Sequence, residues 1–209
     1  MRTAYHQALD HTRLDVVRIG ALTIDAVRTA IHALERRDAT LAGRVIAGDD
    51  EIDDTRRRIE SACIELIWKQ QPVAGELRAI AGMLQIVTDL ERIADYGVDI
   101  SKNAIKLADV AVRPASFEIG QMSAAAIAML DDVMRAYREG DTALADSVIE
   151  RDDQVDRLYH TGIAALQAEM QQDPGVVPAA TILLFVLASI ERVGDRAQNI
   201  AWKTKDIYA

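Results

Sequence analysis

Apolar residues recur every three or four positions almost throughout the chain, and this spacing places them along one side of an α-helix. Val45, Ile52, Ile59 and Leu66 show the pattern in one segment. Few residues interrupt it, because the 209 positions include only 11 glycines and 4 prolines. The pattern therefore predicts an all-α protein.

Five short segments break the helical pattern. Three contain proline, and in the other two an aspartate stands where it can cap the helix that follows. These segments are residues 37–38, 70–72, 112–116, 140–141 and 173–175. They divide the chain into six predicted helices of about 25 to 35 residues, each about 40 to 50 Å long. Helices of that length must pack side by side as bundles.

The two halves of the chain resemble each other. Ala33–Asp53 reads ALERRDATLAGRVIAGDDEID, and its counterpart 103 positions later reads AYREGDTALADSVIERDDQVD. Leu90–Ile100 reads LERIADYGVDI, and its counterpart 100 positions later reads IERVGDRAQNI. Such a repeat predicts two tandem, pseudo-symmetric three-helix bundles, at residues 1–113 and 114–209.

Charge and cysteine content narrow the function classes. The chain has 33 acidic and 24 basic residues and a net charge of -9, which disfavours nucleic acids and anionic membranes as partners. Its one cysteine, Cys63, fits a reducing compartment and lies on a predicted core stripe. The opening residues lack the apolar stretch of a signal peptide. The apolar run 176–190 is about 15 residues, shorter than the roughly 20 of a membrane span. We therefore expect a soluble cytoplasmic protein without direct membrane insertion, in which residues 182–187 belong to the core.

Each half carries two acid-x-x-x-Asp motifs, whose two acids share a helix face. One such pair means little in a chain with 33 acids, but these recur in both halves and lie on the apolar stripes. One of these stripes runs from Leu77 through Ile80, Leu84 and Val87 to a motif acid. The eight acids are Asp49, Asp53, Glu91, Asp95, Asp152, Asp156, Glu191 and Asp195.

The heights of these motifs along their predicted hairpins match. In each half the paired motifs lie about 20 residues before and after the turn, and the mismatch corresponds to about 1.5 to 3 Å of helix rise. Four carboxylates should therefore face one another in each half. They require metal ions, basic residues or shared protons. Oxygen ligands favour hard cations such as Mg²⁺, Ca²⁺, Mn²⁺ or ferric iron. No histidine follows a glutamate by three residues, so the motif of ferritin-like di-iron oxidases is missing from the sequence.

Arg56, Arg57 and Arg58 form a short basic run. Asp53, Asp54 and Glu60 lie within helical reach of it. We expect a solvent-facing set of ion pairs here rather than a binding patch.

The motifs resemble those of the PhoU family of phosphate-transport-system regulatory proteins, over nearly the whole chain. The resemblance rests on Gln71–Arg78 (QPVAGELR), Leu90–Asp95 (LERIAD), Ile190–Asp195 (IERVGD) and Asn199–Ala201 (NIA). The opening MRTAYH is similar to actinobacterial members of the family.

The resemblance implies a negative regulator of the phosphate-starvation response and no enzyme activity. Such a protein acts between the high-affinity phosphate transporter, through its ATPase subunit, and a sensor histidine kinase, in the cytoplasm and at the membrane only through these partners. A homodimer is compatible with it. The resemblance also implies multinuclear iron or zinc clusters at the eight acids, with magnesium, manganese and calcium as alternatives.

This chain departs from the family pattern beside the motifs. The family often has Gly before the motif Asp and His after it, whereas this chain has Ala94 and Tyr96 in the first half. The second half has Gly194 and Arg196. A metal shell that used this histidine would differ here. One turn beyond the motifs, Asp99 and Asn199 are either extra ligands or solvent-facing groups.

Three functions therefore stay open from the sequence. The first is a non-enzymatic signalling adaptor whose metal ions fix the helix geometry. The second is a metal-dependent hydrolase that activates water for phosphate-ester cleavage. The third is a metal-free helical scaffold whose acids are protonated or paired with a basic partner.

Overall fold

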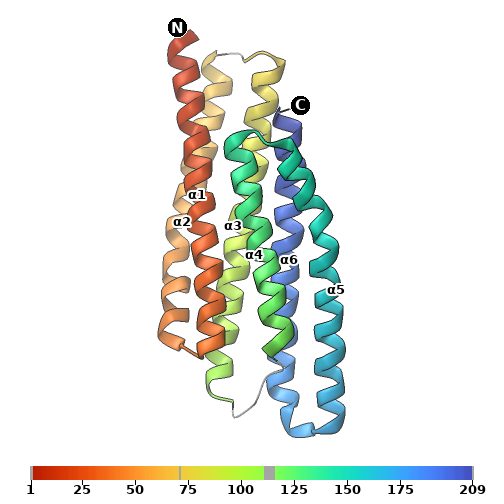
Figure 1. The fold of residues 1–209 in the computed structure, drawn as a ribbon. Coiled ribbons are helices and arrows are strands. Elements are labelled where there is room, and N and C mark those ends of the chain that lie inside the picture. Colours follow the sequence, from red (N-terminus) through yellow and green to blue (C-terminus); the bar gives the residue numbers. More distant parts are fainter. Residues whose placement is uncertain (1, 71, 111–115, 209) are drawn as a thin grey trace.

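The helices begin and end at the residues that break the apolar pattern. The computed structural model describes residues 2–70, 72–110 and 116–208, and within these ranges it has helices and no β-strand (Figure 1). The prediction of an all-α chain is confirmed. The elements are α1 (Arg2–Arg36), α2 (Ala39–Gln70), α3 (Ala74–Ala108), α4 (Ser116–Glu139), α5 (Thr142–Gln172), the short 3-10 helix η1 (Pro174–Val176) and α6 (Val177–Tyr208).

Two tight turns, between α1 and α2 and between α4 and α5, have the same construction. Asp38 and Asp141 each accept a 2.9 Å hydrogen bond from a main-chain N–H in the first turn of the following helix, as the sequence predicted. Before each aspartate the backbone turns left-handed, with φ of 52° at Arg37 and 68° at Gly140. Glycine adopts this conformation freely, whereas a residue with a Cβ is strained in it.

The turn between α5 and α6 is built from the predicted Asp-Pro-Gly segment. The carboxylate of Asp173 accepts a 2.8 Å hydrogen bond from the N–H of Gly175, which ends α5 and begins η1. The predicted boundary between residues 113 and 114 lies outside the described residues.

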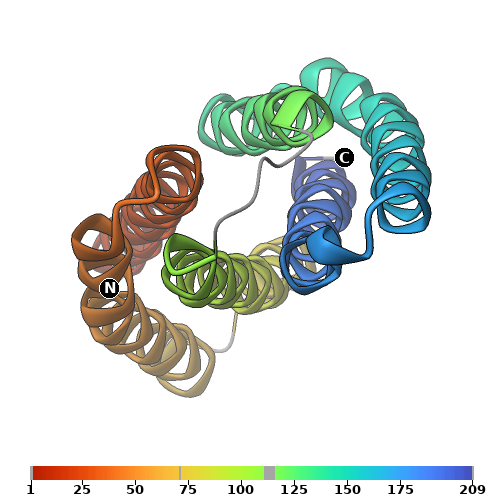
Figure 2. The same cartoon turned by 90° about the horizontal axis from the view of Figure 1, so that it is seen from below.

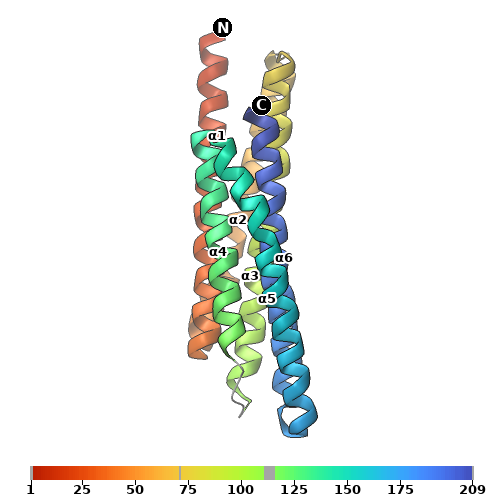
Figure 3. The ribbon, with the colours of Figure 1, turned by 45° about the vertical axis from the view of Figure 1, so that its right-hand side comes forward.

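The six α-helices of the described residues form two three-helix bundles that share a long contact. Helices α1, α2 and α3 pack on one another, as do α4, α5 and α6. Seen along the helix axes, α3 and α6 lie side by side in the centre, with the other helices around them (Figure 2). Helix α4 also runs beside α1 (Figure 3). The predicted pair of pseudo-symmetric bundles is therefore confirmed.

The apolar stripes fill the cores of both bundles. On α3, Ile80 and Val87 are fully buried, whereas Leu77 is 44% exposed. The prediction that Leu77 belongs to the core is wrong, because this residue lies in the first turn of α3, at the end of the hairpin. Cys63 is fully buried, and burial, followed by the charge of Glu60, raises the pKa of its thiol to about 11. It is a structural cysteine, as expected.

Helix α6 is the most apolar element. The segment Pro174–Tyr208 is long and apolar enough to cross a membrane by length and composition, and 44% of its most apolar window is buried inside the fold. Leu183, Val186 and Leu187 are at most 1% exposed, whereas Phe185 is 63% exposed. The predicted core role of this run therefore holds for the residues that face α3, α4 and α5.

Candidate metal centres

The second half brings its motif acids together where α5 and α6 run side by side. We call Asp152, Asp156, Glu191 and Asp195 the second-half cluster. One carboxylate oxygen from each of Asp156, Glu191 and Asp195 lies within 4.8 Å of the other two. Two oxygens bound to one cation at about 2.0 to 2.6 Å are at most about 5 Å apart. These three side chains could therefore bind a common ion.

Asp152 is the fourth member of the second-half cluster and the most buried. Its side chain is 7% exposed, and among the described residues its Oδ1 atom has no hydrogen-bond partner. Burial raises its pKa from 3.8 to about 6, with the other three acids of the cluster as the next largest causes. A buried carboxylate without a partner is strongly unfavourable, so Asp152 requires a cation or a proton.

Gly194 allows α5 to approach α6 at this cluster. A Cβ atom at Gly194 would lie 3.3 Å from Asp152 Oδ1 and 3.2 Å from Val155 Cγ1, which is tighter than ordinary packing. The first half has Ala94 at the equivalent position. Only the second half therefore has a glycine at this position, and the absence of a Cβ atom there allows the close approach of Asp152.

The first half also brings its motif acids to one place, on α2 and α3. We call Asp49, Asp53, Glu91 and Asp95 the first-half cluster. Burial is the main cause that raises the pKa of Asp49, Glu91 and Asp95, and repulsion from neighbouring acids of the cluster comes next. Within the described ranges, however, no three carboxylates of this half lie as close together as those of the second half.

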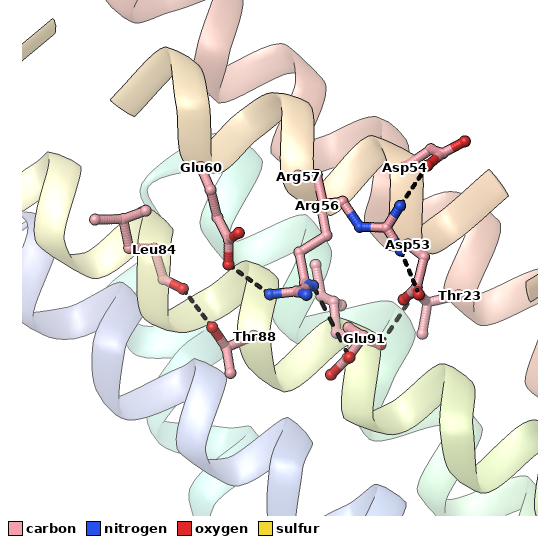
Figure 4. Close-up of polar contacts among 10 residues, drawn as sticks. Thr23, Asp53, Asp54, Arg56, Arg57, Glu60, Leu84, Thr88 and Glu91 are labelled. Carbon is pink, nitrogen blue, oxygen red and sulfur yellow. Dashed lines mark hydrogen bonds and ion pairs between the residues drawn. The ribbon is translucent and has the colours of Figure 1, made fainter. Parts of the chain in front are cut away.

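Two arginines of α2 reach the first-half cluster (Figure 4). Arg57 Nη2 lies 3.1 Å from Asp53 Oδ2, and Arg57 Nη1 lies 2.8 Å from Asp54 Oδ1. Arg56 Nη1 lies 2.6 Å from Glu60 Oε1, and Arg56 Nε lies 3.9 Å from Glu91 Oε1 on α3. The predicted ion pairs within α2 are confirmed.

The contact from Arg56 to Glu91 was not predicted. Counting in helical steps along α2 gives Asp49, Asp53, Arg56 and Glu60, so Arg56 continues the face that carries the acids. The position of Arg56 on this helix face was the sequence signal that could have predicted its contact with Glu91. It identifies Arg56 as a positive charge beside the first-half cluster.

His160 is a second residue near the acids that the motif spacing did not predict. It stands four residues after Asp156 on α5, and so on the same helix face. Its charge lowers the pKa of Glu191, against the larger effects of burial and neighbouring acids. Histidine therefore lies close enough to the second-half cluster to act on it electrostatically.

The residues that follow the motif aspartates face the opposite half. Arg196 Nη1 lies 3.2 Å from Asp89 Oδ1, which joins α6 to α3. The guanidinium of Arg192 lies 5.8 Å from the centre of the Tyr96 ring, again across the same contact. Tyr96 and Arg196, which stand one position after the motif aspartates, therefore connect the two bundles.

Asp99 and Asn199, the two further candidate ligands, lie one turn beyond the motifs. Asp99 Oδ1 lies 3.9 Å from Lys102 Nζ, and both side chains are 55% exposed. Asn199 is half-buried on α6. The position of Asp99 favours a solvent-facing role.

The residues of the second-half cluster fit a bound cation. The donor set consists of carboxylates, which hard metal ions prefer. Among the described residues Asp152 Oδ1 is a buried atom without a partner, and a side chain at Gly194 would crowd it. The first-half cluster has acids at the four equivalent positions, and the guanidinium groups of Arg56 and Arg57 lie beside them.

Comparisons with known proteins agree on one family. The family described as "PhoU domain" matches residues 16–104 and 119–204, one segment in each half of the chain. The "Phosphate-specific transport system accessory protein PhoU homolog" of Rhizobium meliloti (strain 1021) is 33% identical over 200 residues, which cover 95% of this chain and 84% of that protein. The homolog of the same name from Aquifex aeolicus (strain VF5) is 38% identical over 184 residues, covering 88% of this chain and 83% of that protein.

Solved structures show the same fold. The crystal structure of PhoU from Pseudomonas aeruginosa superposes with a TM-score of 0.94 at 31% sequence identity, covering 97% of this chain and 98% of that one. The phosphate transport system regulatory protein PhoU from Streptococcus pneumoniae gives a TM-score of 0.90 at 24% identity, covering 97% and 96%.

Proposed function

Because the chain belongs to the PhoU family, we propose that it is a regulatory accessory protein of a phosphate-specific transport system. In this proposal it represses the phosphate-starvation response by binding both the ATPase subunit of the transporter and a sensor histidine kinase. The names of its relatives support the transport-system role.

The second part of the proposal is that metal ions, iron or zinc before manganese, magnesium or calcium, bind the two acidic clusters. The observation that carries it is the buried Asp152 carboxylate, which has no partner among the described residues and lies with three further acids. The ligands would be Asp156, Glu191 and Asp195, which lie closest together, and Asp152 beside them in the second half. Asp49, Asp53, Glu91 and Asp95 are the equivalents in the first. A bound cation supplies the positive charge that offsets the repulsion among these carboxylates.

The positive charge of a bound cation would also hold two helices together. Each cluster joins two neighbouring helices, α2 to α3 in the first half and α5 to α6 in the second. A cation held between them fixes the helix pair, and so fixes the outer surfaces that partners contact. The protein would then act by presenting a rigid surface rather than by turning over a substrate.

A metal-dependent hydrolase needs a substrate pocket open to several of the clustered acids. The structure has a pocket of about 340 Å³ between α1, α2 and α3. Of the first-half cluster its lining includes Asp49 alone, and apolar residues such as Leu22 and Leu41 border it as well. This pocket would therefore present a single motif acid to a substrate.

We place the protein in the cytoplasm, attached to the membrane only through its partners. The buried face of α6, which contacts α3, α4 and α5, supports a core role for the most apolar helix. The exposed remainder of that helix is available to a partner or a second copy of the chain.

The test is regulation in cells that lack the native gene. Cells are complemented with wild-type protein or with the double variant Asp95→Ala/Asp195→Ala, and a phosphate-responsive reporter is followed in high phosphate. We expect repression with the wild type and its loss with the double variant. Asp50→Ala/Asp153→Ala is the matched control, because it removes two neighbouring exposed acids on α2 and α5. Equal repression by all three proteins would refute the role of the clusters.

A further inference from the structure

Among the described residues, the two acidic clusters differ in whether a guanidinium group forms an ion pair with their carboxylates. In the first half, Arg57 Nη2 lies 3.1 Å from Asp53 Oδ2, and Arg56 Nε lies 3.9 Å from Glu91 Oε1 (Figure 4). Two of the four carboxylates therefore already have a guanidinium partner. Arg56 reaches across from α2 to α3, as a metal ion in this place would do.

The repeat places different residues at these two positions in the second half. With the 103-residue offset that aligns α2 with α5, Arg56 corresponds to Tyr159 and Arg57 to His160. Tyrosine carries no positive charge. A neutral histidine offers a ring nitrogen to a metal, whereas the guanidinium of arginine has no acceptor and keeps its charge.

Arg192 and Arg196 lower the pKa of Asp195 by their charge, against the larger effects of burial and of Asp156, but their guanidinium groups make their close contacts elsewhere. Arg196 pairs with Asp89 on α3 at 3.2 Å, and Arg192 lies over the Tyr96 ring. Arg151 pairs with Asp132 on α4 at 2.7 Å. In the part of the chain that the structure describes, no lysine or arginine forms an ion pair with any acid of the second-half cluster.

We propose that the two clusters are unequal: the second-half cluster binds the first and tighter metal ion, while Arg56 and Arg57 act as built-in counter-cations of the first-half cluster. A cation entering the first half meets two fixed positive charges and competes with them for Asp53 and Glu91. A cation entering the second half meets Asp152, whose Oδ1 has no partner to give up among the residues that the structure describes. This inference rests on the proposed metal binding.

The expected difference is large enough to measure. One unit charge a few ångströms from a bound divalent cation, at the effective dielectric constant of a partly exposed site, changes its affinity by about tenfold or more. The first-half cluster should therefore have at least about tenfold weaker affinity than the second.

The experiment titrates Zn²⁺, and separately Mn²⁺, into the chelator-treated full-length chain by calorimetry. Asp195→Asn leaves the first-half cluster to be measured, and Asp95→Asn leaves the second. We expect tight binding in Asp95→Asn and at least about tenfold weaker binding in Asp195→Asn. Adding Arg56→Tyr and Arg57→His to Asp195→Asn, which copies the second-half residues, should strengthen binding by about tenfold.

Two further variants complete the design. Arg58→His in the Asp195→Asn background removes an arginine whose side chain donates to Thr55 instead of an acid, and it should leave the affinity unchanged. Tyr159→Arg with His160→Arg in the Asp95→Asn background should weaken binding by about tenfold. Circular dichroism checks that each variant is helical.

The outcomes separate this inference from the function it rests on. Equal metal affinity at the two clusters would overturn the inequality and leave the metal role standing. The same would follow if Arg58→His changed the affinity of the first-half cluster as much as Arg56→Tyr with Arg57→His. No binding of either metal to any variant would overturn both.

Discussion

Replacing Asp152 with asparagine should stabilise the metal-free protein at neutral pH. The side chain is 7% exposed, and its pKa is raised from 3.8 to about 6. Each pKa unit corresponds to about 1.4 kcal/mol, so ionised Asp152 lowers the free energy of unfolding by about 3 kcal/mol. Asparagine removes this charge at nearly constant shape. For a chain of this length the gain corresponds to an increase in Tm of about 6 to 12 °C.

The sign of the pH dependence follows from the direction of the shift. Above pH 6 Asp152 is ionised in both the folded and the unfolded chain, and the full penalty is present in the folded state. Below about pH 4 the carboxyl is protonated in both states, and the penalty disappears. The advantage of Asp152→Asn should therefore be largest at pH 7.5 and should fade between pH 6 and pH 4.

Thermal unfolding in the presence of a chelator, at pH 7.5 and pH 4, measures both effects. Asp153→Asn is the matched control, because its side chain is exposed on the same helix and should change stability by less than about 0.5 kcal/mol. An unchanged Tm for Asp152→Asn at pH 7.5, or an advantage that persists undiminished at pH 4, would refute the reasoning. With metal added the order should reverse, because asparagine cannot replace a charged ligand.

Three further predictions concern the fold around the clusters. Gly140→Ala should lower the free energy of unfolding by about 1 kcal/mol in urea titrations, because φ at this position is 68° and the added Cβ would lie 3.2 Å from the Tyr208 ring; an unchanged or higher value would contradict the assigned strain. Arg196→Gln should lower stability by about 2 kcal/mol, because it leaves the carboxylate of Asp89 without its partner between α3 and α6. Combining it with Asp89→Asn should recover part of this loss, and a purely additive double-mutant cycle would refute the coupling. Gly194→Ala should destabilise by about 1 kcal/mol and weaken metal binding in the second half, since its Cβ would lie 3.3 Å from Asp152 Oδ1; calorimetric binding equal to wild type would show that this approach is not needed.

The helices could be predicted from the sequence because their signals are local. Asp38 and Asp141 cap the helices they precede, and the Asp-Pro-Gly turn ends α5. A capping residue acts on the three residues that follow it, so its effect does not depend on the rest of the fold. The left-handed backbone of Arg37 carries no such signal, since its residue type disfavours it.

That the motif acids of neighbouring helices lie near one another could also be predicted, because equal distances from a hairpin turn fix equal heights. What height does not fix is how deep each side chain lies and which way it points. Asp152 is buried while its equivalent Asp49 is only half-buried. This difference accompanies the packing of α5 against Gly194, which is a tertiary property. The one sequence signal was the change from Ala94 to Gly194.

The contact between the two bundles could not be predicted. The repeat indicates two similar units, but it does not say which faces meet. The motif spacing places Tyr96 and Arg196 directly after predicted metal ligands, whereas in the fold they face the opposite bundle. Both α3 and α6 bury residues on more than one side, so their apolar patterns do not separate the core of a bundle from the surface between bundles.

The central claim is that the acidic clusters hold metal ions, and elemental analysis tests it most directly. Untagged protein is purified without chelator and analysed by inductively coupled plasma mass spectrometry, beside Asp95→Ala/Asp195→Ala and the control Asp50→Ala/Asp153→Ala. We predict more than one equivalent of iron, zinc or manganese per chain in the wild type and the control, and its loss in the cluster variant. No bound metal in the wild type, together with no thermal shift when metal is added, would contradict the account and favour a metal-free scaffold whose acids meet a basic partner.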